Sequence, residues 1–175
     1  MIVGHLPAGY LVSRLVFYRL GSGNVKLKWL LLIGLFGSIA PDLDLFYAYF
    51  FAHTYRHHHT YWTHLPIVWF SLLLLSIGLR SFGLRTRFSA YLLAFSLNGF
   101  VHMILDTIAG DIWWLAPFVD ESYTFYSQDM GYERRWMNIL FNWAFAVEMG
   151  IVASALYLGY RDIRVRRKLM EVGGA

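Results

Sequence analysis

Long apolar runs constrain this chain more than any other feature of its sequence. Five runs occur, at residues 2–20, 28–50, 65–84, 88–109 and 136–160. Each is close to the roughly 20 residues that a helix needs to cross a bilayer. Only 15% of the 175 residues are charged, whereas soluble domains carry about 25%. We therefore predict a single-domain, all-α integral membrane protein (1–175) with about five transmembrane helices.

The second run contains a helix-breaking segment, Ala40-Pro41-Asp42-Leu43-Asp44. Proline lacks a backbone donor and disfavours a helical conformation at the residue before it. This span is therefore predicted to break at Pro41. If the chain is extended there, the carboxylates of Asp42 and Asp44 point to the same side. The alternative is that Asp42 caps the helix that follows.

The basic residues give the chain a predicted orientation. Twelve of the fifteen lysines and arginines fall within 14–28, 80–87 and 161–168. With five spans, these three segments lie on one side, which the positive-inside rule makes cytoplasmic. The N-terminus is then outside and the C-terminus is cytoplasmic. The tail after Arg161 is predicted to be helical only at its start.

Potential metal ligands gather on the opposite side of the membrane. The chain has no cysteine, so a transition metal would need histidine and carboxylate ligands. Four of the seven histidines lie within residues 57–64. Asn98, His102 and Asp106 follow at four-residue spacing, which places them on one helical face. The alternative for this polar stripe is a buried hydrogen bond between helices.

The candidate metal ligands come from four separate segments. They are His5, Asp42, Asp44, His59, His64, His102 and Asp106. Three consecutive histidines cannot all face one centre, so the choice among His57, His58 and His59 stays open. Asp44 is also a candidate general base, and His58 a candidate proton carrier. These ligands suit one or two divalent ions, with zinc favoured over manganese or iron.

Four motifs follow one another along the chain. They are Gly4-His5, Pro41-Asp42-Leu43-Asp44, His59-x-x-x-Thr63-His64, and His102-x-x-x-Asp106-Thr107 with Gly110 and Trp114-Leu115-Ala116-Pro117-Phe118 after it. This ordered set resembles that of the YdjM-type family of predicted membrane-bound metal-dependent hydrolases. The resemblance covers about residues 4–118. It implies an inner-membrane protein of bacteria or archaea with a hydrolase-type metal site.

These observations predict a hydrolase that cleaves a phosphoester, ester or amide in a lipid or lipid-linked substrate at the outer membrane face. Arg134 and Arg135 are expected to bind the substrate's phosphate or carboxylate group, or else to anchor the chain at the interface. The alternative function is non-enzymatic metal binding or metal transport. Nucleic acid is not an expected partner, because the basic residues flank apolar spans. Glu148 is expected to pair with another helix. The substrate and the oligomeric state do not follow from the sequence.

Overall fold

The described part of the chain is helical. The computed structural model describes the backbone of residues 3–20, 25–52, 58–125 and 135–173. Within these ranges the only β-type pairing is an isolated antiparallel bridge between Ile112 and Tyr123. The helices are α1 (His5–Leu20), α2 (Leu27–Ile39), α3 (Leu43–Tyr47), η1 (Ala48–Ala52), η2 (His58–Thr60), η3 (Trp62–His64), α4 (Pro66–Ser81), α5 (Arg87–Ala109), α6 (Arg135–Leu140) and α7 (Trp143–Gly173). The all-α prediction is confirmed.

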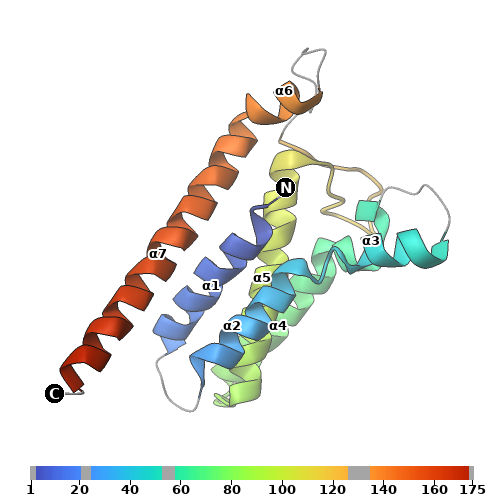
Figure 1. Cartoon of the computed structure of the whole chain (residues 1–175). Coiled ribbons are helices and arrows are strands. Elements are labelled where there is room, and N and C mark those ends of the chain that lie inside the picture. The colour runs from blue at the N-terminus through green and yellow to red at the C-terminus, as the bar shows by residue number, and fades with distance from the viewer. Residues whose placement is uncertain (1–2, 21–24, 53–57, 126–134, 174–175) are drawn as a thin grey trace.

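Helix α5 is the centre of the bundle. It packs against α1, α2 and α4, while α7 lies against α1 (Figure 1). The helices approach one another closely where small residues face a neighbour. A Cβ atom on Gly37 of α2 would lie within 3.0 Å of the backbone of Phe95 on α5. Small residues at such points allow helices to pack tightly within a membrane, where lipid is as apolar as the side chains.

The prediction of five spans is met only in part. Among the described residues, α5 and the Trp143–Val165 part of α7 are long and apolar enough to cross a membrane. A third candidate is the bent pair formed by α2 and Leu43–Phe51, while α4 is a shorter apolar helix. Helix α1 has 16 residues, or about 24 Å of helix, which is less than the roughly 30 Å of a hydrocarbon core.

The predicted break at Pro41 is present. Helix α2 ends at Ile39, and the helical segment that begins at Leu43 is bent from it by 56°. Of the two alternatives for this segment, the extended one is excluded, because Asp42 has helical backbone angles (φ −70°, ψ −3°). Asp42 occupies the position before α3, but its side chain makes no capping hydrogen bond. Its carboxylate is therefore available for other contacts.

The C-terminal part of the chain differs from the prediction at both ends. The predicted span 136–160 is divided into α6 and α7, and α7 begins where the Asn142 side chain accepts a hydrogen bond from the Ala144 N–H at 2.8 Å. Helix α7 then continues to Gly173, well past the predicted end near Arg161. Between these two residues the tail lacks glycine and proline and is rich in good helix formers.

One end of the bundle collects the segments that carry the candidate ligands. The start of α1, the end of α2, helix α3 and the end of α5 lie toward the same end, and the last turns of α7 lie at the opposite end (Figure 1). Helix η3 packs against η2 and α3 and leads directly into α4. This arrangement agrees with a polar site at the helix ends.

Candidate metal centre

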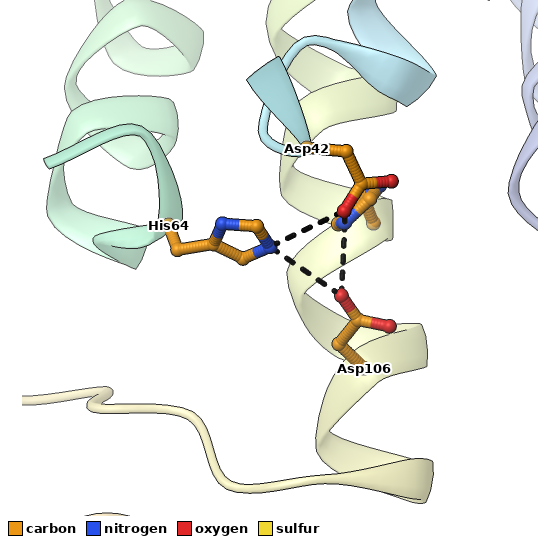
Figure 2. A group of neighbouring side chains, drawn as sticks. Asp42, His64 and Asp106 are labelled. Atoms are coloured by element: carbon orange, nitrogen blue, oxygen red, sulfur yellow. Dashed lines mark ion pairs between the residues drawn. The ribbon is translucent and has the colours of Figure 1, made fainter. Parts of the chain in front are cut away.

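Two histidines and two aspartates form a compact group at this end. Asp42, His64, His102 and Asp106 each offer a ligand atom, and all four atoms lie within 4.8 Å of one another. His64 Nε2 is 3.7 Å from both Asp42 Oδ1 and Asp106 Oδ2. His102 Nε2 is 3.6 Å from Asp42 Oδ1 and 2.9 Å from Asp106 Oδ2. Figure 2 shows Asp42, His64 and Asp106 converging from three different segments.

The hydrogen bond behind His102 fixes which of its nitrogens faces the group. His102 Nδ1 lies 2.8 Å from the Ser38 carbonyl oxygen, which can only accept. Nδ1 therefore carries a proton, and in the neutral imidazole Nε2 presents a lone pair. That lone pair faces Asp106 Oδ2 at 2.9 Å, and Nε2 is buried without a hydrogen-bond partner among the described residues. His102 Nε2 and Asp106 Oδ2 are then two acceptors that face each other, and they need a cation or a proton between them. His102 and Asp106 therefore fit a metal ion.

His64 is also held from behind. Its Nδ1 forms a hydrogen bond with Asp44 Oδ2, which also accepts a hydrogen bond from Thr63 Oγ1 at 3.2 Å. A carboxylate behind the non-ligating nitrogen is the usual support of a metal-binding histidine. The Trp69 indole N–H donates to the Thr63 carbonyl at 2.7 Å and so fixes the segment to α4.

The charges around His64 favour a cation at this position. Burial alone would lower the pKa of His64, but the carboxylates of Asp106 and Asp44 beside its two nitrogens outweigh burial and raise this pKa to about 9. Without a metal ion, His64 is therefore protonated at neutral pH. The positive charge of the protonated ring offsets the negative charge of nearby carboxylates, and a divalent ion at the group would offset it in place of the proton.

The two aspartates after Pro41 contact the same imidazole from opposite sides. Asp44 bonds to Nδ1, whereas Asp42 Oδ1 faces Nε2. An extended chain at Asp42, one of the two geometries predicted for this segment, would have put both carboxylates on one side. The helical turn at Asp42 separates the two side chains, and the ring of His64 lies between them. Asp44 is therefore placed behind His64, while Asp42 belongs to the four-residue group.

His5 and His59 border the group through Asp106. His5 Nε2 lies 3.0 Å from Asp106 Oδ1, and its ring stacks on His102 with centroids 3.8 Å apart. His59 Nε2 is 3.9 Å from Asp106 Oδ2, and its Nδ1 lies 2.6 Å from the Asp111 carbonyl oxygen. Of the seven predicted ligands, four form the group, while His5 and His59 contact it through Asp106 and Asp44 supports it through His64.

Other predicted residues lie where the structure gives no description. His57 and Arg134 fall outside the described residues, and so do the side chains of His58 and Arg135. The proposed proton carrier and the two substrate-binding arginines therefore remain predictions.

The group is open on one side. The side chains of His64 and His102 are 0% exposed and that of Asp106 is 5% exposed, but that of Asp42 is 35% exposed. Structural zinc sites are usually closed by four protein ligands, whereas catalytic sites keep a position that water or substrate can reach. The partial exposure of Asp42 provides such an approach.

Sequence reasoning missed several groups that support the centre. The carbonyls of Ser38 and Asp111 fix two imidazoles, but a backbone acceptor leaves no mark in a sequence. The sequence predicts Trp69 only as part of the apolar span 65–84. Its N–H was a usable signal, because a buried indole normally finds a hydrogen-bond acceptor.

These features define a helical membrane protein with a candidate histidine–aspartate metal centre at one end of its bundle. The chain belongs to the YdjM inner membrane protein family, whose model matches residues 1–167. The match confirms the family resemblance and extends beyond the motifs at 4–118. The family and the apolar helices assign the chain to the inner membrane. The comparisons found no similar curated protein and no similar solved structure.

Proposed function

We propose that this protein is a membrane-embedded, metal-dependent hydrolase. The observation that carries the proposal is the partly open group of Asp42, His64, His102 and Asp106. Both histidines are held through Nδ1, so that each directs Nε2 to the same centre. A site with prearranged ligands and access from one side suits catalysis better than a purely structural role.

The residues divide into ligands and supporting groups. Asp42, His64, His102 and Asp106 would hold a divalent ion, most simply zinc, with His59 as a further candidate ligand. When bound, the ion would supply Lewis acidity and an activated water. In this proposal Asp44 orients His64 through its hydrogen bond to Nδ1. This role takes the place of the general-base role that the sequence predicted for Asp44. Asp42 is the exposed carboxylate and the one best placed to accept a proton from a water molecule at the open side.

A lipid or lipid-linked substrate, with a phosphoester, ester or amide bond to be cleaved, fits the surroundings of the site. The segment α3–η1 follows Asp42 directly and exposes several apolar and aromatic side chains. They are Leu43, Leu45, Phe46, Tyr47, Tyr49, Phe50 and Phe51. Aromatic residues favour the membrane interface, and a substrate held there would reach the centre from the side of Asp42. The positive-inside rule supports the proposal that the site lies at the outer face, because most lysines and arginines lie in segments other than those that form the site.

Metal content and turnover in purified protein test this proposal. The wild type, His64→Ala and Asp106→Ala are assayed for bound zinc, manganese and iron, and for release of phosphate, fatty acid or amine from a panel of phospholipids and lipid-linked phosphates. Asp120→Ala is the matched control, because Asp120 is an exposed carboxylate outside the group. We expect both site variants to lose metal and turnover, while the control retains them.

The outcomes separate the two candidate functions. Equal hydrolysis by the wild type and both site variants would refute the hydrolase assignment. Metal-dependent uptake into proteoliposomes without any hydrolysis would favour the transport alternative. Stoichiometric metal without turnover or uptake would identify a metal-binding protein with no enzymatic role.

A further inference from the structure

Glu148 is a buried carboxylate that the proposed hydrolysis does not use. It lies within the membrane-crossing part of α7 and is only 4% exposed. An ionisable group at membrane depth is costly and needs specific partners. Glu148 Oε1 accepts hydrogen bonds from the backbone N–H groups of Val3, at 2.6 Å, and of Gly4, at 2.9 Å. Helix α7 thus contacts the very start of α1, which confirms that Glu148 pairs with another helix.

These two N–H groups have no partner within α1 itself. The first hydrogen bond of the helix runs from the Ala8 N–H to the Gly4 carbonyl, at 2.9 Å. The N–H groups of the opening turn of a helix need an acceptor from elsewhere. A carboxylate at this end is also favoured by the helix dipole. Glu148 therefore fixes the position and direction of the first turn of α1.

The first turn of α1 carries His5 into the metal centre. His5 Nε2 lies 3.0 Å from Asp106 Oδ1, and the His5 ring stacks on His102. The other oxygen, Asp106 Oδ2, faces His102 and His64. A displacement of His5 would release Oδ1 and allow the carboxylate to rotate, so that Oδ2 would leave the position it holds in the group.

We infer that Glu148 is a positioning residue of the metal centre, acting through the start of α1 and His5 on the carboxylate of Asp106. The inference rests on the proposed function, because it assumes that this centre holds the metal ion. By this inference α7, which contributes none of the four candidate ligands, helps to hold the site in place through Glu148.

A second contact between α1 and α7 supplies a control. Arg14 on α1 forms an ion pair with Asp162 on α7, and Arg14 also donates to Tyr10 Oη at 3.0 Å and Tyr18 Oη at 3.1 Å. This contact is more than two helical turns from His5. Asp162→Asn should therefore weaken the attachment of α7 without moving the centre.

Zinc affinity of the purified full-length protein tests the inference. We expect Glu148→Ala to weaken Zn²⁺ binding by about tenfold or more, as removal of a supporting group commonly does. Glu148→Gln should remain near wild type, because the amide oxygen can still accept from both N–H groups. Asp162→Asn should lower the unfolding temperature and leave Zn²⁺ affinity unchanged.

The path through His5 is tested by repeating the measurement in a His5→Ala background. There Glu148→Ala should cause no further loss of Zn²⁺ affinity, since the group that transmits its effect is gone. An equal fold-loss in both backgrounds would overturn the inference.

A measurement without metal separates this inference from the proposed function. In metal-free protein with ¹⁵N-labelled histidine, Glu148→Ala should shift the imidazole nitrogen signals of His5, whereas Asp162→Asn should not. Unshifted His5 signals would overturn the inference even if zinc binds. Failure of the wild type to bind any divalent ion would refute the metal centre, and the His5 signals would still decide the role of Glu148.

Discussion

Gly99 offers a stringent test of the packing that supports the metal centre, although it touches no ligand. It lies on α5 against the indole ring of Trp69 on α4. A Cβ atom at this position would come within 3.0 Å of three carbons of that ring, closer than real Cβ atoms approach. Gly99→Ala must therefore displace Trp69, whose N–H holds the Thr63 carbonyl next to His64.

The structure sets the size of the expected effect. Ordinary contacts begin at 3.4 Å, so the ring must retreat by roughly 1 Å or more. Overpacking of this kind costs about 1–3 kcal/mol. For a chain of this size, that cost corresponds to a fall of about 2–12 °C in unfolding temperature. The displaced Trp69 would also move the segment with Thr63 and His64, so Zn²⁺ affinity should fall as well.

Thermal unfolding in detergent and Zn²⁺ titration measure the two effects. Gly78→Ala on α4 is the matched control, because a Cβ atom there would meet nothing within 4 Å. It should be neutral or slightly stabilising, since alanine is the better helix former. If Gly99→Ala matches Gly78→Ala in both assays, the close packing of Trp69 against α5 does not support the centre.

Three further predictions concern charged side chains. Asp44→Asn should weaken Zn²⁺ binding about 10–100-fold, because His64 loses the carboxylate at its Nδ1; wild-type affinity in a zinc titration would contradict this. The pKa of His64 is raised from an ordinary 6.5 to about 9, so Zn²⁺ must displace a proton from this ring to bind. The Zn²⁺ affinity should therefore rise with pH, by up to about tenfold per pH unit below pH 9. A Zn²⁺ affinity that stays constant between about pH 6 and 8 would refute this prediction. Arg14→Leu leaves Asp162 without its guanidinium partner. This change should destabilise the protein by about 1–3 kcal/mol, which is less than the loss expected for a fully buried ion pair. Chemical or thermal unfolding measures the loss of stability.

Sequence alone was a good guide to the chemistry of the centre because that chemistry depends on residue type and local spacing. The spacing of His102 and Asp106 places them one turn apart on any α-helix, and the structure buries both. Pro41 broke the helix as its missing N–H requires. The absence of cysteine confined the candidate ligands to histidine and carboxylate.

The same reasoning failed where distant segments determine the outcome. Asp42 and Asp44 flank His64 because the backbone turns at Asp42 and because η3, which carries His64, packs against α3. The shortness of α1 and the continuation of α7 to Gly173 changed the predicted spans, because apolar content alone does not define where a helix starts and ends.

The sequence by itself predicted an all-helical membrane protein whose candidate histidine and aspartate ligands, from separate segments, would lie close together. Hydrophobic run length, helix periodicity and side-chain chemistry are local properties, so they can be read residue by residue. Only the tertiary structure decided which atom of each ligand faces the centre. Ser38 directs His102 through a backbone carbonyl, and Glu148 reaches the start of α1 from 144 residues away. Such contacts depend on how the helices pack against one another, which no local pattern in the chain records.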